Sequence, residues 1–288
     1  MIKLSVIIVS YQSDAVILDC LDSIQRFNDL GKELEVVVVD NFQNSNLSNL
    51  IESIDYGFLL NYKLADDNRG FGAGNNMGVN IASGEVMLFL NPDTILIENI
   101  FADVYEAIHS NSHLIYGFSL IDKLGRLNNS YSFFYDSYII YHALAVMKMF
   151  NYCYPIKKKW TNKYLWPWGA AFAINKEVFV SAGCFDENIF LCNEEPDLMQ
   201  RIPQRHVYIS DHKIIHLEGS GDVVSEYRYY NSLISFDYYM KKYNISFLNR
   251  FLWDIYIKLK CWRINHFSNT ESERNYVKAY RRFKQKKL

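Results

Sequence analysis

Three carboxylates stand within four residues of the chain, at Glu194, Glu195 and Asp197. They follow the apolar run 189–191, which we expect to be buried, so at least one of them should lie in a cleft. A partly buried carboxylate beside other carboxylates has a raised pKa, which suits a general base. The alternative is that these acids favour a helix start through its dipole, which would explain one or two of them. Pro196 fixes the backbone and should aim Glu195 and Asp197 differently.

A second candidate site combines a carboxylate with a histidine. Asp93 ends the stretch Glu85–Asp93, in which five apolar residues stop at Asn91-Pro92-Asp93. Such a run is typical of a strand buried on both faces, and Pro92 ends it. His216 follows two isoleucines and precedes a Gly-Ser-Gly loop. The two side chains could supply ligands for Mg²⁺ or Mn²⁺, although a lone histidine at a strand end is more often structural.

These residues need a scaffold that brings distant parts of the chain together. Apolar runs predict strands over Leu4–Val9, Leu34–Val39 and Val86–Leu90, with helices between them. This alternation is typical of an α/β fold with a doubly wound, parallel sheet. The carboxyl ends of parallel strands share one edge of a sheet, so the polar residues that follow these strands should line one crevice. Those residues are Ser10, Tyr11, Asp40, Asn41, Asn91 and Asp93.

The remaining elements continue the alternation. A loop rich in glycine and asparagine, Asn68–Gly78, should open a helix that runs through Ala82. The other predicted helices cover Ala15–Phe27, Asn46–Ile54, Ile97–His109, Lys176–Ser181 and Leu198–Ile202, the last stopped by Pro203. The other predicted strands cover Phe58–Leu64, Leu114–Leu120, Ala171–Ile174 and Val207–Ser210.

The composition suggests the compartment and the partners. Five scattered cysteines without a CxxC pair indicate reduced thiols in the cytosol, and the apolar run at the N-terminus is too short for a signal peptide. The net charge of −2 hides an asymmetry: residues 241–288 hold 13 Lys/Arg and 3 Asp/Glu, or +10, and the rest holds 17 and 29, or −12. A basic, aromatic tail favours an anionic membrane surface as partner. The alternative is a charged, solvated helix pair that packs on the domain.

Seven motifs in order resemble the family 2 inverting glycosyltransferases with the GT-A fold. They span residues 4–222 and read VIIVSYQS, VVVDN, NRGFGAGNN, FLNPD, GAAFAINKEVFVSAGCFDENIF, NEEPDL and IIHLEGSG. The likeness is greatest to bacterial rhamnosyltransferase-type enzymes of surface polysaccharide assembly. It implies a GT-A domain over 1–222, Rossmann-like with a mixed, mostly parallel sheet flanked by helices. It also implies that 223–288 form a basic, aromatic, membrane-associating helical extension.

The resemblance implies roles for residues at matching positions. The donor nucleotide would be held by the first two strand ends and by the glycine-asparagine loop, through Ser10, Tyr11, Asp40, Asn41, Asn68, Gly70, Phe71, Asn75 and Asn76. Asp93 matches the last acid of the D-x-D motif, which holds the divalent cation at the donor's diphosphate. Asn91 replaces the first acid of that motif, and His216 matches a histidine that completes the metal site. Glu195 matches the catalytic base, where Asp is more usual, and Asp197 matches the acid two residues later.

The implied reaction moves rhamnose or another hexose from a nucleoside-diphosphate sugar to a hydroxyl of a polyprenyl-diphosphate-linked glycan, in O-antigen or capsule synthesis. Glu195 would take the hydroxyl proton, and a single displacement would invert the anomeric carbon. One base suffices, unlike the two carboxylates of a glycoside hydrolase. The protein would work in the cytoplasm, peripheral on the inner face of the plasma membrane, and would not bind nucleic acid.

Two other functions compete with this interpretation. A non-catalytic nucleotide-sugar-binding or scaffold subunit of a polysaccharide assembly complex is favoured by Asn91 and Pro196, which depart from the family pattern. A nucleotidyltransferase would share the parallel sheet. It would need a glycine loop with a basic residue directly after the first strand, and Ser10–Asp14 contains neither glycine nor lysine.

Overall fold

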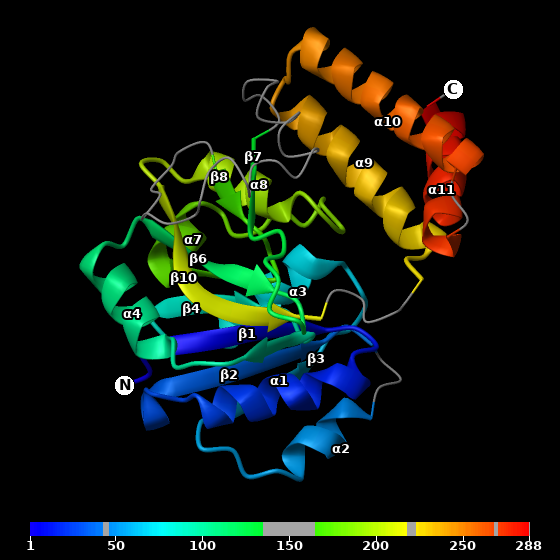
Figure 1. Ribbon diagram of the computed structural model, residues 1–288. Coiled ribbons are helices and arrows are strands. Elements are labelled where there is room, and N and C mark those ends of the chain that lie inside the picture. The colour runs from blue at the N-terminus through cyan, green and yellow to red at the C-terminus, as the bar shows by residue number, and fades with distance from the viewer. Residues whose placement is uncertain (43–45, 135–164, 218–222, 268–269, 288) are drawn as a thin grey trace.

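The computed structural model describes residues 1–42, 46–134, 165–217, 223–267 and 270–287. Its centre is an eight-stranded sheet of order β3-β2-β1-β4-β9-β6-β10-β5 (Figure 1). Strands β3, β2, β1 and β4 are parallel, β9 is antiparallel to both β4 and β6, β10 is parallel to β6, and β5 is antiparallel to β10. The predicted mixed, mostly parallel sheet is therefore confirmed. The strands are β1 (Leu4–Ser10), β2 (Leu34–Asp40), β3 (Leu59–Leu64), β4 (Val86–Leu90), β5 (Thr94–Leu96), β6 (Leu114–Ile121), β9 (Ala171–Asn175) and β10 (His206–His216).

Helices cover both faces of this sheet. In Figure 1, α1 and α2 lie below the sheet. One face of the sheet shares a hydrophobic cluster with α1 (Asp14–Arg26), α2 (Leu47–Glu52) and α4 (Phe101–Ser110). The other face shares a second cluster with α3 (Phe71–Ile81), α7 (Lys176–Ser181) and α8 (Glu194–Arg201). A 3₁₀ turn, η1 (Gly31–Glu33), precedes β2, and a small separate sheet pairs β7 (Tyr131–Phe133) with β8 (Leu165–Pro167).

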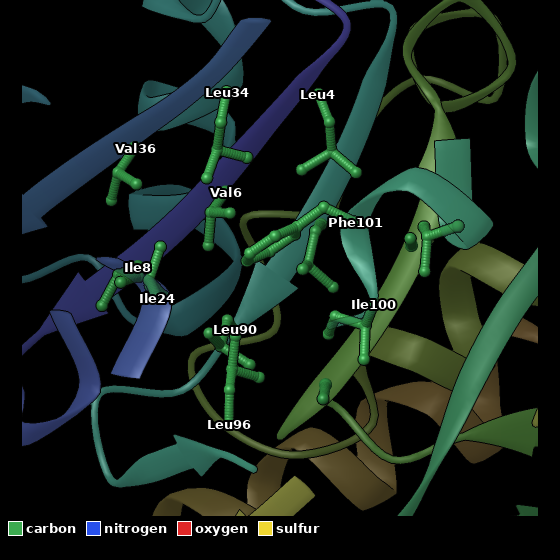
Figure 2. Close-up of a cluster of buried hydrophobic side chains, with 14 of the residues drawn as sticks. Leu4, Val6, Ile8, Ile24, Leu34, Val36, Leu90, Leu96, Ile100 and Phe101 are labelled. Atoms are coloured by element: carbon green, nitrogen blue, oxygen red, sulfur yellow. The ribbon is translucent and has the colours of Figure 1, made fainter. Parts of the chain in front are cut away.

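The continuous apolar runs fold as strands because both sheet faces are buried. Alternate side chains of β1 point to opposite faces, so Leu4, Val6 and Ile8 enter the cluster of Figure 2, whereas Ile7 and Val9 pack on the side of α3. Each such fully buried aliphatic side chain stabilises the fold by about 1.5–3 kcal/mol. The first polar residues of the crevice thus follow directly after rigid, buried strands.

The glycines of α3 let this helix lie close to the sheet. A Cβ on Gly74 would clash with Val9, and one on Gly78 would clash with Ile7. Glycine normally weakens a helix by about 1 kcal/mol relative to alanine. Here the close approach of the helix backbone to β1 explains why glycine recurs in this stretch.

Two predicted helix boundaries were wrong. The helix expected over Ile97–His109 begins only at Phe101, because Thr94–Leu96 forms β5 and pairs with the distant β10. The helix expected over Leu198–Ile202 begins at Glu194 and ends at Arg201. Pro196 does not prevent the early start, because backbone N–H groups in the first turn of a helix need no intrahelical partner.

The predicted helical extension at the C-terminus is present. It consists of α9 (Glu226–Lys242), α10 (Phe247–Phe267) and α11 (Glu271–Lys287), which form a three-helix unit, yellow to red in Figure 1. Small clusters of buried side chains join α9, α10 and α11. The domain boundary expected after residue 222 adjoins residues outside the described part and stays a prediction. Among the described helices, none has the length and apolar character needed to cross a membrane.

Candidate active site

The parallel strands bring the predicted strand-end residues to one edge of the sheet. Ser10 and Asp40 are register partners at the ends of β1 and β2, and the Asn41 N–H donates to the Ser10 carbonyl at 2.8 Å. Ser10 Oγ is buried and has no hydrogen-bond partner among the described residues. Tyr11 is half exposed and meets Phe42 edge-on, with ring centroids 5.6 Å apart. A half-exposed aromatic ring next in the chain to an unsatisfied hydroxyl suits a planar polar ligand such as a nucleotide base.

The acid and the amide after β2 have different surroundings. The buried carboxylate of Asp40 accepts hydrogen bonds from the Phe42 N–H at 2.9 Å and from the Tyr62 hydroxyl at 3.0 Å, so both oxygens already have partners. The Asn41 amide donates to the Gly70 carbonyl at 3.2 Å. Asp40 therefore holds the loop in shape, and Asn41 connects β2 to the glycine-asparagine loop.

That loop is fastened to the segment that precedes α8. Asn68 Oδ1 accepts the Gly70 N–H at 3.0 Å, and the Phe71 N–H donates to the Phe190 carbonyl at 3.1 Å. Gly70 has φ +98°, and a Cβ there would strike the Phe190 carbonyl. Only glycine suits this position, because φ is positive and the contact is with backbone.

Asn75 and Asn76, both predicted to line the donor site, are engaged in contacts within the protein. The buried Asn75 amide donates to the Phe71 carbonyl at 2.9 Å. Asn76 binds the backbone of Phe185 twice, donating and accepting at 2.9 Å, and also donates to Glu187. These contacts hold α3 and the turn before α8 together, so the two residues shape the site, and direct donor contact stays a prediction.

The predicted metal pair is brought together by β5 and β10. These strands pair Thr94 with His216, and Asp93 Oδ1 lies 3.5 Å from His216 Nε2. Burial acts to raise the pKa of Asp93, but the hydrogen bond and charge of His216 outweigh it and lower the pKa below its usual value. His216 is buried, and its Nδ1 has no hydrogen-bond partner among the described residues. The corner therefore holds an ionised carboxylate beside a buried imidazole, whose Nε2 faces that carboxylate.

The donor set at this corner is small. Within the described ranges, no cluster of three or more His, Cys, Asp or Glu side chains could hold a metal ion. Mg²⁺ is commonly bound by one or two carboxylates and completed by substrate phosphates and water. Asp93 fits that mode, in which the ligand brings the remaining oxygens, and His216 lies beside it as a nitrogen ligand of the kind that transition metals accept.

Glu195 occupies a protected position at the start of α8. Its Oε1 lies directly against the backbone of Gly169, where any Cβ would clash with it. Burial raises the pKa of Glu195 to about 7, although backbone hydrogen bonds, including one with Gly169, act to lower it. A carboxylate with a pKa near neutrality is matched to proton transfer near neutral pH.

The backbone connects this carboxylate to the metal corner. Ala170, next to Gly169, accepts a hydrogen bond from the Asn91 N–H at 2.9 Å, at the point where β4 and β9 pair. Asn91 lies two residues before Asp93. Gly169, against which Glu195 lies, and Asp93 therefore flank the same end of the β4–β9 pair.

Glu194 is a site residue to which the sequence interpretation gave no role of its own. It is 1% exposed, packs against Gly72 of α3, and its Oε1 has no hydrogen-bond partner among the described residues. Burial and the neighbouring charge of Glu195 raise the pKa of Glu194 well above its usual value. The adjacent acidic pair in the sequence was the available signal, but it did not show which carboxylate is the deeper one.

Asp197 has a different environment from Glu195. The two residues are about 200° apart around the helix. Asp197 is fully buried, and its oxygens bind Arg201 at 2.8 Å, Lys242 at 2.6 Å and the Tyr243 hydroxyl at 2.9 Å. Because all of these groups already use its carboxylate, the structure favours a role in fixing α8 to α9, and the predicted catalytic role of Asp197 stays a prediction.

Comparisons with known proteins agree with this architecture. The chain is 27% identical over 137 residues to GalNAc(5)-diNAcBac-PP-undecaprenol beta-1,3-glucosyltransferase of Campylobacter jejuni, covering 45% of this chain and 42% of that protein. It is 23% identical over 217 residues to the low-salt glycan biosynthesis hexosyltransferase Agl10 of Haloferax volcanii, covering 74% and 65%. The chain thus spans less than two thirds of the length of these curated relatives.

A solved structure and a family model extend the comparison. The crystal structure of GalNAc-T7 with UDP, GalNAc and Mn²⁺ superposes with a TM-score of 0.58 at 16% identity, covering 81% of this chain and 47% of that one, which shows the GT-A fold. The model of Glycosyl transferase family 2 matches residues 5–179, a segment that includes β1 to β4, Asp93 and Gly169. On this match and on the fold, the chain belongs to glycosyl transferase family 2.

Proposed function

We propose that the protein is an inverting glycosyltransferase that moves a hexose, rhamnose among the candidates, from a nucleoside-diphosphate sugar to a hydroxyl of a lipid-linked glycan. The observation that carries the proposal is the placement of Glu195. Its carboxylate has a pKa of about 7 and rests on Gly169, whose neighbour Ala170 is hydrogen-bonded to Asn91 beside the metal corner. A base and a diphosphate-binding corner on one sheet edge are the parts that such a transfer needs.

The chemistry assigns one role to each of these parts. Glu195 takes the proton from the acceptor hydroxyl, whose oxygen then attacks the anomeric carbon of the donor sugar. The bond from that carbon to the diphosphate breaks, and the nucleoside diphosphate leaves with the electron pair. A single displacement places the new bond on the opposite face, which inverts the configuration.

Asp93 and His216 would hold Mg²⁺ or Mn²⁺ at the diphosphate. A divalent cation there would neutralise the negative charge that develops on the leaving group. Ser10 and Tyr11 suit the nucleotide at the other end of the edge, where the buried hydroxyl and the half-exposed ring are found. Asn41 and the Asn68–Gly70 loop would close the donor site between these two ends.

The acceptor that we propose is a polyprenyl-diphosphate-linked glycan of O-antigen or capsule synthesis. The name of the Campylobacter relative describes such an undecaprenol-linked acceptor. An acceptor of this kind requires the enzyme to work at the inner face of the plasma membrane, as a peripheral protein of the cytoplasm. The positive charge of residues 241–288 supports an approach to anionic lipid.

Released nucleoside diphosphate is the direct assay. Purified protein should be screened with a panel of UDP- and dTDP-sugars and a lipid-linked acceptor, with Mg²⁺, Mn²⁺ or a chelator. We expect release to depend on one donor and on a divalent cation. The product should carry the anomeric configuration opposite to that of the donor. Retention of configuration would refute the single-displacement chemistry.

A non-catalytic nucleotide-sugar-binding or scaffold subunit is the second candidate, favoured by Asn91. An amide at this position leaves the metal corner with one carboxylate, Asp93, from the segment after β4. Tight nucleotide binding without turnover of any donor, in the presence of acceptor, would support this candidate over the first.

A further inference from the structure

Helix α10 presents large apolar side chains on the side opposite to its packed face. The apolar positions Leu248, Phe251, Ile255, Leu259 and Trp262 recur at intervals of three and four residues and so lie on one side of the helix, here called the outer face of α10. Four of them are strongly exposed: Leu248 by 60%, Phe251 by 51%, Leu259 by 59% and Trp262 by 55%.

The opposite side of α10 has its partners inside the extension. Cys261 and Ile264 are buried in a cluster with Tyr276 and Val277 of α11, and Ile257 packs against that cluster. The hydrophobic contacts of this cluster between α10 and α11 therefore do not use the outer face. Contiguous exposed apolar side chains of this size mark a surface that meets an apolar partner.

Basic side chains border the outer face. Lys258 and Arg263 lie about 60° and 80° to either side of its centre, and their side chains are 60% and 63% exposed. Lys258 and Lys284 bind the carboxylate of Asp254 at 2.6 and 2.8 Å, and Arg263 binds Glu273 at 3.2 Å, so the excess of basic residues sets the charge of this surface. Residues 241–288 as a whole carry +10.

The charges decide between possible partners of this surface. Two copies of the chain that met through their outer faces would bring two segments 241–288 of +10 each together, which like-charge repulsion opposes. An anionic lipid surface attracts the same charges. It also accepts leucine and phenylalanine side chains at the acyl boundary and tryptophan at the headgroup level.

We propose that the outer face of α10 docks on an anionic lipid surface, with α10 lying in the plane of the interface. The proposal rests on the proposed function, because docking would serve to bring the active site to a lipid-linked acceptor. The docked unit is directly bonded to the catalytic helix, because Lys242 of α9 binds both Asp186 and Asp197 at 2.6 Å. Docking would therefore fix the orientation of the helix that carries Glu195 relative to the lipid surface.

Vesicle co-sedimentation of the full chain tests the proposal without any sugar transfer. The vesicles are phosphatidylcholine with and without phosphatidylglycerol. Leu259→Asp should weaken binding to the anionic vesicles at least tenfold, since it replaces an inserted apolar side chain by a charge. Leu124→Asp is the matched control: this leucine is 76% exposed in a turn of the GT-A domain, and its replacement should leave binding unchanged.

A charge variant tests the second half of the proposal. Neutralising Lys258 and Arg263 together as glutamines should weaken binding about 25-fold, or fivefold per cation, with Lys123→Gln as the control for an exposed lysine elsewhere. Equal binding of the wild type to neutral and anionic vesicles would overturn the assignment of an anionic partner.

Three results would overturn the docking surface itself. The first is vesicle binding by Leu259→Asp that equals that of the wild type. The second is a wild-type oligomer that this substitution dissociates. The third is a large drop in the melting temperature of Leu259→Asp, which would show that the outer face packs within the fold. Nucleoside diphosphate binding by Leu259→Asp should equal that of the wild type. Vesicle binding without any sugar transfer by the wild type would leave this proposal standing while the proposed function failed.

Discussion

Replacing Glu195 with glutamine should abolish sugar transfer and stabilise the fold above neutral pH. Glutamine keeps the size of the side chain and its contact with Gly169 but cannot accept the acceptor's proton. Loss of a positioned general base typically costs 10²–10⁴-fold in rate. Because the nucleotide is expected at the strand ends, nucleoside diphosphate affinity should stay within about twofold of the wild type.

The stabilisation follows from the pKa of the carboxylate. The pKa of Glu195 in the fold is about 7, against 4.5 for an ordinary glutamate, because burial disfavours its charge. Below pH 4.5 the carboxyl is protonated in both the folded and the unfolded state, and its contribution to stability is fully present. That contribution is lost as the pH rises through 7, where the folded protein must hold the charge. At about 1.36 kcal/mol per pH unit, the loss reaches up to ~3 kcal/mol, and the glutamine variant avoids it.

Urea unfolding at about pH 5 and about pH 8 measures this difference. The wild type should lose up to about 3 kcal/mol of unfolding free energy between these pH values relative to Glu195→Gln. Glu106→Gln, a change at an exposed glutamate of α4, serves as the control and should behave as the wild type. Parallel assays follow nucleoside diphosphate release and nucleotide binding by the same proteins.

Two outcomes would refute this reasoning. Equal unfolding free energies of the wild type and Glu195→Gln at both pH values would show that the carboxylate is not held in a desolvated position. Retained turnover by the variant would show that another group is the base, and Glu194, the deeper of the two acids, would then be the residue to test.

Three further predictions follow from the same contacts. The rate of sugar transfer at low substrate should fall about tenfold per pH unit below 7, since the base must be ionised, and a pH–rate profile of the wild type checks this. Gly169→Ala should displace the Glu195 carboxylate and lower kcat by about 100-fold with little change in nucleotide affinity, as measured by turnover and titration calorimetry. Lys242→Met should lower the unfolding free energy measured with urea by about 1–3 kcal/mol, because the buried Asp197 loses a partner. It should also lower kcat more than it raises KM. Lys241→Met, a change at a lysine that is 66% exposed, should alter neither the unfolding free energy nor the kinetic constants.

Local patterns in the sequence were sufficient to predict which polar residues meet at one edge of the sheet. The runs of β1, β2 and β4 were apolar enough to require burial on both faces, and the polar residues after them had to meet at one edge of a parallel sheet. The structure places Ser10 and Asp40 in register as that rule requires. Strand β5 was missed because three residues carry little periodicity and its partner, β10, is distant in the sequence.

The roles within the acidic cluster depended on tertiary contacts. The sequence put Glu194, Glu195 and Asp197 together, but the contacts of Glu195 with Gly169 and of Asp197 with Lys242 involve residues far from them along the chain. Burial raises the pKa of Glu195 against the opposing hydrogen bond with Gly169, while the ion pair with Lys242 holds Asp197 to α9.

The sequence by itself determined the fold class, the strand ends and the positive charge of the C-terminal helices, because these depend on residue type and local spacing. Only the tertiary structure decided how each carboxylate of the acidic cluster is buried and paired and which side of α10 remains exposed. Both depend on which surfaces are buried by segments distant in the chain. Burial acts through solvent exclusion in three dimensions, and no spacing within a single segment can specify it.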